Sequence, residues 1–337
     1  MNETILLIGG CGFIGSHCCV ELQKNGYNVI IVDNLINSDK DVMINIEKIT
    51  NTKPKFYNNN ISDENNMDII FNDNKIDAVI HLAGFKSVNE SKIDPLKYYE
   101  NNVSNLIILL KCMKKYNVNK LIFSSSALVY GNSDIIPINE KCNINILNPY
   151  AQTKFMSELI LKDCSEIYNI SCISLRYFNP VGCHSSGLLE ENYKIAPNNL
   201  FPIIISIYNG YKDKLEIFGA DYNTKDGTGV RDYIHVEDIA RGHLQTLKYM
   251  GSNDLVKFDI FNLGTGIGYS VLDIINKFEL HSNKKIPYVF KDRRIGDPDI
   301  LLADSNKASK IMGFNPIYNL DDMISSSLKS YRLKNNL

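Results

Sequence analysis

Short apolar runs alternate with segments of helical periodicity through the first half of this chain. Apolar runs bounded by turn-forming residues are typical of buried strands, whereas apolar residues three and four positions apart are typical of helices that pack on a sheet. The runs predict strands at 4–8, 29–32, 55–57, 78–80, 121–123 and 173–176, and helices that close at Asn25-Gly26 and span 64–71, 95–116 and 150–168. This alternation predicts an α/β fold with a doubly wound, mainly parallel sheet of the Rossmann type.

The alternation stops after Gly182. A loop-like stretch at 184–192 precedes a predicted helix at 200–208 and a strand at 215–218. A helix at 236–250, a strand at 258–262 and an amphipathic C-terminal helix at 320–333 follow. The pattern therefore predicts a second, smaller α+β lobe made of discontinuous pieces.

Composition and charge exclude several classes of function. Of the 337 residues, 44% are hydrophobic and 22% are charged, which is typical of a soluble globular protein. A formal net charge of −2 argues against nucleic acid as a partner. Met1-Asn2-Glu3-Thr4 lacks the basic start of a signal peptide, and the apolar run from Ile5 is too short to span a membrane. The eight cysteines follow neither a disulfide framework nor a metal-binding spacing, so we expect reduced thiols, no metal and a cytoplasmic location.

A glycine-rich turn, Gly9-Gly10-Cys11-Gly12-Phe13-Ile14-Gly15, directly follows the first predicted strand. The next strand ends at Asp33. Such a turn lets the backbone approach a pyrophosphate at a helix N-terminus, while the acidic residue binds the ribose hydroxyls. The complete order of strand, turn, helix, strand and acid predicts a dinucleotide site. Asp33 would repel a 2′-phosphate, so NAD is favoured over NADP.

Tyr150 and Lys154 are the candidate catalytic pair. Asn148-Pro149 predicts the start of a helix, on which residues four apart share one face, so the Lys154 ammonium is expected near the Tyr150 phenol. A phenol titrates near ~10, and a base working at pH 7 needs a pKa about three units lower, which a fixed cation favours. The pairs Tyr116–Lys120 and Tyr208–Lys212 have the same spacing, but helix ends are expected to break both. Because the chain has 19 tyrosines, a structural role is the alternative for Tyr150 taken alone.

Residues that follow the predicted strands are expected to meet at one edge of the sheet. Parallel strands joined by right-handed crossovers end at the same edge, where open α/β sheets bind ligands. Gly9, Asp33, Ala83 and Ser126 are therefore expected along this edge, with residues 177–180 after the strand at 173–176. Ser126 is the candidate hydroxyl beside the tyrosine, although three serines in a loop are also typical of turns.

These residues resemble the extended short-chain dehydrogenase/reductase superfamily and, within it, the UDP-glucose 4-epimerase family. The stretch most specific to the family is Asp226-Gly-Thr-Gly-Val-Arg-Asp-Tyr-Ile-His235, whereas the glycine turn and the tyrosine–lysine pair mark only the superfamily. Further matching stretches are 33–35, 81–86, 98–103, 124–131, 176–182, 197–200, 262–264 and 293–297. The resemblance implies an NAD-dependent isomerase of galactose metabolism that interconverts UDP-galactose and UDP-glucose through a 4-keto intermediate.

The resemblance also implies a domain division and an assembly. Residues 1–180, with 236–262 returning to them, would form the NAD-binding domain. Residues 181–235 and 263–337 would form the UDP-sugar-binding lobe. Two subunits would pair through the helices at 95–116 and 150–168 to make a homodimer.

Carried over residue by residue, the resemblance implies three sets of site residues. Tyr150 would be the base, Lys154 would hold the nicotinamide ribose and lower the pKa of Tyr150, and Ser126 would bind the sugar 4-hydroxyl. The NAD site would comprise Gly9, Gly12, Phe13, Ile14, Gly15, Asp33, Asn34, Asn37, Asn60, Ile61, Leu82, Ala83, Gly84, Lys86, Asn101, Ser124, Tyr150, Lys154, Tyr177 and Phe178. The UDP-sugar site would comprise Lys86, Ser126, Tyr150, Asn179, Asn199, Leu200, Phe218, Arg231, Tyr233, Arg294, Asp297 and Leu301.

The chain departs from the family pattern at several positions. Asn60 stands where an adenine-contacting aspartate is usual, so weaker retention of NAD is expected, and Leu128 stands where threonine is usual. Leu301 stands where family members with tyrosine are restricted to UDP-glucose and UDP-galactose, while those with a small side chain also accept N-acetylated sugars. If Leu301 faces the sugar, low turnover of N-acetylated sugars is expected; a packed core position is the alternative.

Arginine usage points to a diphosphate independently of the resemblance. Six of the 36 basic residues are arginines, and Arg231, Arg293 and Arg294 lie in the predicted second lobe. The guanidinium fork binds a diphosphate through two hydrogen bonds in a way that lysine cannot. Solvated surface arginines are the alternative.

The same scaffold also carries functions other than epimerisation. A 4,6-dehydratase of the superfamily has an acidic pair after the serine, where this chain has Ala127-Leu128. A decarboxylase needs a positive group for a carboxylate, and nothing in the sequence marks one. A UDP-N-acetylglucosamine 4-epimerase and a non-catalytic NAD-sensing or scaffold protein are the remaining alternatives. The scaffold protein would be expected to lack Tyr150 or Lys154, and both are present.

Overall fold

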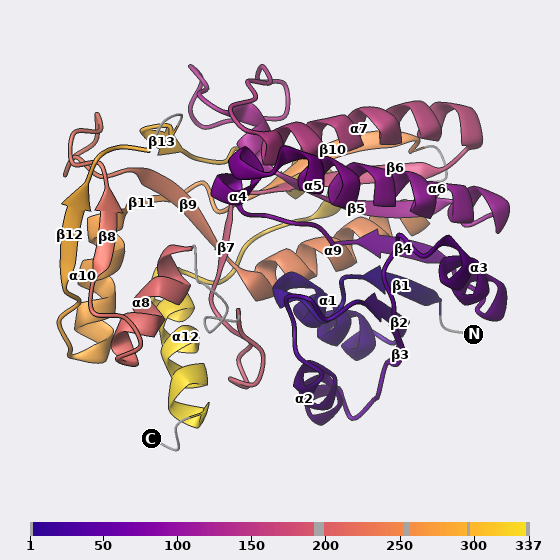
Figure 1. Ribbon diagram of the computed structural model, residues 1–337, viewed down its shortest axis with the longest axis horizontal. Coiled ribbons are helices and arrows are strands. Elements are labelled where there is room, and N and C mark those ends of the chain that lie inside the picture. Colours follow the sequence, from indigo (N-terminus) through magenta and orange to yellow (C-terminus); the bar gives the residue numbers. More distant parts are fainter. Residues whose placement is uncertain (1–2, 192–198, 253–255, 295–296, 335–337) are drawn as a thin grey trace.

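The computed structural model describes residues 3–191, 199–252, 256–294 and 297–334, and a seven-stranded sheet lies at its centre (Figure 1). The strand order is β10-β6-β5-β4-β1-β2-β3, and every pairing in it is parallel. The strands are β1 (Thr4–Ile8), β2 (Asn28–Asp33), β3 (Lys55–Asn58), β4 (Ala78–His81), β5 (Lys120–Ser126), β6 (Ser171–Tyr177) and β10 (Phe258–Leu263). The predicted doubly wound α/β fold is confirmed.

Helices pack on both faces of this sheet, and each strand contributes side chains to a separate hydrophobic core on either face. In β1, Ile5 and Leu7 belong to one core, and Leu6 and Ile8 belong to the other, since successive side chains point to opposite faces. The first core includes residues of α1 (Phe13–Lys24), α2 (Asp41–Thr50), α9 (Val236–Gly251) and α11 (Asn306–Met312). The second includes residues of α3 (Glu64–Asp73), α6 (Asn105–Lys115) and α7 (Pro149–Tyr168).

The predicted helix at 95–116 is right in extent but not in regularity. The structure has α4 (Val88–Ile93), α5 (Pro95–Tyr99), a π-helical turn (Glu100–Ser104) and α6 in succession. A π-turn is a local widening of the kind often found at functional sites. It places the buried Asn102 amide against the backbone of Phe85, where Oδ1 accepts from the N–H at 2.8 Å and Nδ2 donates to the carbonyl at 3.0 Å. Periodicity did not predict this turn because the apolar pattern continues through it.

The second lobe has its own small sheets and core. Strands β7 (Asn179–Val181), β9 (Val230–His235), β11 (Gly268–Ser270) and β13 (Ile300–Leu301) form one sheet, while β8 (Leu215–Phe218) pairs with β12 (Tyr288–Lys291). Helices α8 (Leu200–Tyr208), α10 (Val271–Ser282) and α12 (Leu320–Lys334) pack a third core. The predictions at 200–208 and 215–218 are confirmed, and β10 lies in the large sheet. Strands β7, β11 and β13 are too short for a periodic signal, and they were not predicted.

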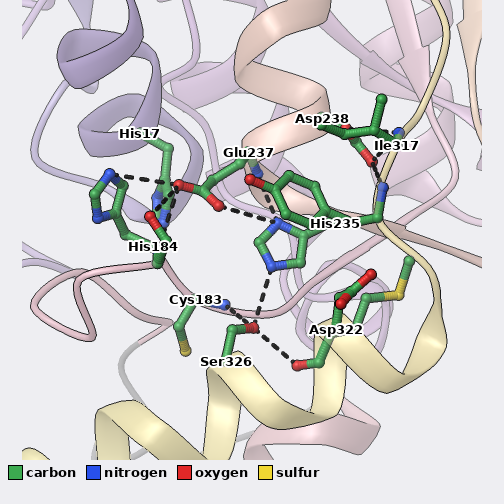
Figure 2. A network of polar contacts seen from close by, with 12 residues as sticks. His17, Cys183, His184, His235, Glu237, Asp238, Ile317, Asp322 and Ser326 are labelled. Atoms are coloured by element: carbon green, nitrogen blue, oxygen red, sulfur yellow. Dashed lines mark hydrogen bonds and ion pairs between the residues drawn. The ribbon is translucent and has the colours of Figure 1, made fainter.

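A buried polar network joins the two parts of the molecule (Figure 2). The Nε2 atom of His184 lies 3.4 Å from a carboxylate oxygen of Glu237 on α9, and Nε2 of His235 lies 3.1 Å from the Ser326 hydroxyl on α12. His17 of α1 lies beside His184, with 6.0 Å between the ring centroids. Burial lowers the pKa of His17 to about 3 and that of His235 to about 4. These histidines are therefore neutral at neutral pH.

Three further findings concern the chemistry that the chain carries. Among residues 3–191, 199–252, 256–294 and 297–334, no helix is long and apolar enough to cross a membrane. Within the same described residues, no group of three or more His, Cys, Asp and Glu side chains is placed to hold a metal ion. The eight cysteines are free thiols.

Candidate active site

The carboxyl ends of the parallel strands bring the predicted site residues to one edge of the sheet. Gly9 follows β1, Asp33 ends β2, Ala83 follows β4, Ser126 ends β5 and Tyr177 ends β6. These strands are consecutive neighbours in the order β6-β5-β4-β1-β2. The edge predicted from the crossover rule is therefore present.

The glycine turn requires residues without a Cβ. Gly9 has a φ of +83°, and a Cβ there would lie 2.7 Å from the Ala83 nitrogen. A Cβ at Gly15 would lie 2.2 Å from the Gly9 carbonyl oxygen. Gly12 caps α1 without a side-chain hydrogen bond, and the first turn carries no acidic residue. The N–H groups at this helix end have no side chain to satisfy them, which suits an anionic phosphate.

Asp33 fastens the glycine turn to the loop after β2. Its Oδ2 accepts from the Cys11 N–H at 2.9 Å, and its Oδ1 accepts from the Leu35 N–H at 2.8 Å and the Ser38 hydroxyl at 3.1 Å. A carboxylate has roughly four acceptor positions, so capacity for a ribose hydroxyl remains. The structural role of Asp33 was not predicted, because the donors are backbone groups whose direction a sequence pattern does not show.

The tyrosine–lysine pair is buried near the start of α7. The Asn148 side chain accepts from the Ala151 N–H at 2.9 Å, and Pro149 occupies the first turn, as predicted. Tyr150 is 8% exposed and Lys154 is 5% exposed. The Lys154 ammonium donates to the Ser124 carbonyl at 2.6 Å and lies 6.0 Å from the centroid of the Tyr150 ring. The competing pairs are broken as predicted, because α6 ends at Lys115 and α8 ends at Tyr208.

Burial acts against the charged form of both partners. It lowers the pKa of Lys154 to about 8, although the negative charge of Glu158 opposes the shift. It raises the pKa of Tyr150, although a hydrogen bond with Ser126 opposes the shift. Burial is the larger of the two effects on Tyr150, so the net shift of its pKa is upward, and the lowering of this pKa by Lys154 stays a prediction. The enclosed phenol is neutral at pH 7.

The three serines lie in β5 and not in a loop. The Ser126 hydroxyl accepts from the Leu128 N–H at 3.2 Å and so caps the short 3₁₀ turn Ala127–Tyr130. The turn-chemistry alternative is therefore wrong for Ser124 and Ser125, which pair in register with Leu175 and Arg176 of β6. The pairing of β5 with β6 therefore holds the three serines next to Tyr150 and Lys154.

Tyr177 is held from the far side of the sheet by a residue that the sequence did not single out. Its hydroxyl lies 2.6 Å from Nε2 of His243 on α9, and Nδ1 of His243 lies 2.9 Å from the Ile239 carbonyl. A carbonyl only accepts, so Nδ1 carries the proton and Nε2 accepts from Tyr177. Burial lowers the pKa of His243 to about 4, which keeps the ring neutral. The sequence indicated only that residues 236–262, which include His243, return to the large sheet.

Lys86 and Asn199, which were predicted separately, meet at Glu191. The Lys86 ammonium lies 2.5 Å from Oε1 of Glu191, and the Asn199 amide donates to the same oxygen at 3.0 Å. Glu191 was not predicted, because it lies 105 residues from Lys86 in the chain. Pro197 and Asn198, which belong to the family-like stretch at 197–200, lie outside the described residues.

The remaining residues predicted for the NAD site lie on or beside the same edge. Phe13 and Ile14 begin α1, Leu82 and Gly84 follow β4, and Phe178 follows β6. The side-chain oxygens of Asn34 and Asn60 accept from the N–H groups of Ile36 and Ser62 within their own turns. Asn37 lies in the loop after β2, Ile61 is buried in the second core, and the Asn101 amide donates to Asn102 at 3.0 Å.

The arginines of the second lobe contact aromatic rings and carboxylates. Arg294 lies 4.1 Å from the centroid of the Phe218 ring. Arg231 lies 3.7 Å from a carboxylate oxygen of Asp297. Arg293 pairs with Asp299 at 2.5 Å and lies over Tyr222, a residue that was not predicted. Arg293 and Arg294 are exposed and Arg231 is partly buried, so the alternative of solvated surface arginines stays open for Arg293 and Arg294.

The last predicted sugar-site residues lie on the small sheet and its helix. Asn179 of β7 pairs in register with Tyr233 of β9, whose ring lies 5.7 Å from that of Phe201. Leu200 begins α8. Leu301 of β13 is 3% exposed and belongs to the same buried cluster as Phe178 and Ala127. Leu301 therefore occupies a packed position, as the alternative to a sugar-facing side chain had it, and its contact with the sugar stays a prediction.

A parallel doubly wound sheet with a glycine turn after its first strand and a buried tyrosine–lysine pair at its carboxyl edge defines a dinucleotide-binding enzyme scaffold. Comparison with known proteins assigns it further. The chain belongs to the NAD dependent epimerase/dehydratase family, whose model matches residues 5–264.

Its relatives include UDP-glucose 4-epimerases along the full length. That of Bacillus subtilis (strain 168) is 46% identical over 326 residues, which cover 96% of this chain and 95% of the relative. That of Dictyostelium discoideum is 45% identical over 337 residues, covering 100% and 98%. Among solved structures, the UDP-glucose 4-epimerase from Bifidobacterium longum in complex with NAD+ and UDP has a TM-score of 0.94 at 44% identity, with 99% of both chains covered. That from Stenotrophomonas maltophila, with bound NAD and formylated UDP-arabinopyranose, has a TM-score of 0.96 at 41% identity, again with 99% of both chains covered.

Proposed function

We propose that this protein is an NAD-dependent isomerase that interconverts UDP-galactose and UDP-glucose through a 4-keto intermediate, a step of galactose metabolism. The observation that carries the proposal is the full-length similarity to UDP-glucose 4-epimerases combined with the buried pair Tyr150–Lys154 at the strand ends. A non-catalytic protein on this scaffold would have no use for a buried phenol and ammonium at the ligand-binding edge.

The residues at the sheet edge fit NAD. The uncapped N-terminus of α1 would bind the pyrophosphate, and the carboxylate of Asp33 would bind the adenosine ribose. Bound NAD supplies the acceptor for the hydride of the sugar C4 and returns that hydride. Because Asn60 offers an amide where the family resemblance implies a carboxylate, we expect NAD to be partly lost on purification and activity to rise when NAD is added.

The proton chemistry falls to Tyr150. Its phenolate takes the proton of the sugar 4-hydroxyl and returns it, while the Ser126 hydroxyl holds that oxygen. Ionising a phenol of pKa ~10 at pH 7 costs about 4 kcal/mol, and burial increases this cost. The Lys154 ammonium lies 6.0 Å from the centroid of the Tyr150 ring, and a cation beside the phenol would lower this cost by favouring the phenolate. Lys154 also offers its remaining N–H groups to the nicotinamide ribose.

We assign the UDP-sugar to the site residues of the second lobe and the adjoining strand ends. Arg231 and Arg294 would bind the diphosphate, with Phe218 against the base and Asn179, Asn199, Leu200, Tyr233 and Asp297 as further contacts. We divide the chain accordingly into an NAD-binding domain (1–180 with 236–262) and a UDP-sugar-binding lobe (181–235 with 263–337). The seven-stranded sheet and the two smaller sheets support this division, with two exceptions: β7 begins at Asn179, before the boundary, and α11 packs in the first core of the large sheet.

A 4,6-dehydratase is disfavoured by the residues after Ser126. Ala127 and Leu128 occupy the 3₁₀ turn that caps the strand, and neither supplies an acid or base for elimination. The free thiols support a reducing, cytoplasmic location.

The test is to incubate the purified protein and NAD with UDP-galactose and to resolve the product sugars. We expect UDP-glucose from the wild type and a loss of about 10²–10⁴-fold in kcat, with little change in UDP-sugar affinity, from Tyr150→Phe. Tyr168→Phe, an exposed tyrosine on the same helix, is the matched control and should keep activity. Equal activity of the wild type and Tyr150→Phe would exclude the base assignment, and no UDP-glucose from the wild type would exclude the function.

We further propose a homodimer through the helices of residues 95–116 and 150–168. Large apolar side chains are exposed on these helices, among them Leu96, Ile107, Leu159 and Ile167. Light scattering should report two subunits at micromolar concentration, and Leu159→Asp should shift the protein toward monomer. Ile317→Asp, at an exposed isoleucine elsewhere, should not. A monomeric wild type would refute the assembly.

A further inference from the structure

A buried ion pair lies directly behind the catalytic residues. Arg176 of β6 presents Nε and Nη2 to the two carboxylate oxygens of Glu158 on α7, at 2.9 Å and 2.5 Å. Both side chains are 2% exposed. Removing two charges from water costs about as much as their attraction returns, so a buried pair is weak evidence for a stabilising role. The pair calls for another explanation.

Glu158 contacts the same strand end that the catalytic pair uses. Its Oε1 accepts from the Ser125 hydroxyl at 2.5 Å. The preceding residue, Ser124, offers its carbonyl to Lys154, and the following residue, Ser126, bonds to Tyr150. Helix α7 is therefore fastened to β5 at two points one helical turn apart, once through Lys154 and once through Glu158.

Glu158 is also the negative charge that acts on Lys154. Among the described residues, Tyr150 on its own helix and His81 at the end of β4 also lie near this lysine. Burial together with the lysine charge lowers the pKa of His81 to about 3, so the ring is neutral. Phe123 and the Ser124 carbonyl complete the surroundings of the ammonium. Replacing the Glu158 carboxylate by a neutral group would leave the buried ammonium without a counter-charge.

Arg176 keeps the carboxylate in place. Burial opposes the charge of Arg176, but the hydrogen bonds and the charge of Glu158 raise its pKa, so the guanidinium stays protonated. It also lies 4.7 Å from the centroid of the Tyr130 ring, whose hydroxyl donates to Asn262 at 2.7 Å. The carboxylate is thus held by a fork that is itself packed in the interior.

We propose that Glu158 is a positioning residue of the reaction: anchored by Arg176, it holds the serines of β5 against α7 and keeps Lys154 protonated beside Tyr150. This rests on the proposed epimerase function, in which the ammonium favours the phenolate. Without the carboxylate, Lys154 loses its proton at a lower pH, so the alkaline limit of a reaction that needs the ammonium moves down.

The test is the pH dependence of kcat and KM for UDP-galactose in saturating NAD. Glu158→Gln keeps the shape and an acceptor for Ser125 but removes the charge. We expect the alkaline limb of its kcat profile to move down by about one unit or more, with KM unchanged within a factor of about three. Ser125→Ala removes only the hydrogen bond, so kcat should fall about 2- to 10-fold with the alkaline limb in place. Glu166→Gln, the same change at an exposed site on α7, should alter neither.

The outcomes separate the inference from the function on which it rests. A wild type that forms no UDP-glucose refutes the function. An active wild type whose Glu158→Gln variant keeps the alkaline limb refutes the positioning role alone. If Glu158→Gln fails to fold because Arg176 is left unpaired, the double variant Glu158→Gln/Arg176→Gln leaves no lone charge and carries the same test. The alkaline limb of the kcat profile of this double variant must also move to lower pH for the proposal to stand.

Discussion

Substituting Gly15 by alanine tests whether the glycine turn is a backbone cradle for NAD. A Cβ at this position would lie 2.2 Å from the Gly9 carbonyl oxygen, 2.7 Å from the Gly10 Cα and 3.0 Å from the Gly10 carbonyl carbon. Non-bonded heavy atoms meet comfortably at about 3.5–4.0 Å, so the methyl group must displace the turn by roughly 1 Å. The atoms that it meets are backbone, which no side-chain rotation can move aside.

The magnitude follows from two opposing effects. Forcing an extra methyl group into a packed site costs about 1–3 kcal/mol, and the backbone overlap places Gly15→Ala at the upper end. Alanine is favoured over glycine within a helix by about 1 kcal/mol. We therefore expect a net loss of about 2 kcal/mol in the free energy of unfolding and a drop of at least about tenfold in NAD affinity. The affinity falls because the displaced carbonyl and N–H groups belong to the turn that faces the pyrophosphate.

Two matched variants make the measurement decisive. At Gly12 a Cβ meets only the Gly9 oxygen at 3.3 Å, so Gly12→Ala should weaken NAD binding while costing little stability. At Gly251, the last residue of α9, a Cβ meets nothing within 4 Å, so Gly251→Ala should retain both properties. Urea unfolding followed by circular dichroism suits a chain without tryptophan, and calorimetric titration gives the NAD affinity. If Gly15→Ala binds NAD like the wild type and is as stable as Gly251→Ala, the cradle is refuted.

Three further predictions concern the cofactor acid, the buried histidines and the sugar pocket. Asp33→Asn should lower the affinity for NAD and reduce the preference for NAD over NADP, as measured by calorimetric titration with both cofactors. Unchanged affinities for both cofactors would contradict this prediction. Burial lowers the pKa of His17 to about 3 and that of His235 to about 4, whereas a histidine in the unfolded chain titrates near ~6.5. The unfolded chain therefore binds more protons than the folded chain below pH ~6.5. The contribution of each such histidine to the free energy of unfolding is fully present above pH ~6.5 and falls by about 2 kcal/mol by pH 5. A urea unfolding midpoint that does not change between pH ~7.5 and pH ~5 would contradict this prediction. With Leu301 in the same buried cluster as Phe178, kcat/KM for UDP-N-acetylgalactosamine should be ~10–100-fold lower than for UDP-galactose. Leu301→Cys and Leu301→Tyr should shift the ratio of the two kcat/KM values in opposite directions. The same ratio in all three proteins would show that Leu301 does not control which sugar is accepted.

Features that depend on neighbouring residues could be predicted from the amino-acid sequence. The apolar runs of β1 to β6 predict buried strands because each strand supplies side chains to two cores. The glycine turn and Asp33 are adjacent to strands that a local pattern identifies. Tyr150 and Lys154 lie four apart on a helix whose start is marked by Asn148-Pro149, so their common face followed from helical geometry alone.

The contacts that these residues make depend on how distant segments pack together. The lysine donates to the Ser124 carbonyl, 30 positions away, and the raised pKa of Tyr150 follows from burial that no spacing reveals. Glu191 joins Lys86 across 105 positions, and His243 fixes the proton of Tyr177 across 66. The physical reason is that hydrogen-bond direction and desolvation depend on which distant segments pack together, whereas periodicity reports only the face that a residue occupies on its own element. Local pattern thus determined the scaffold and the catalytic pair, and packing decided the proton positions and charges with which that pair works.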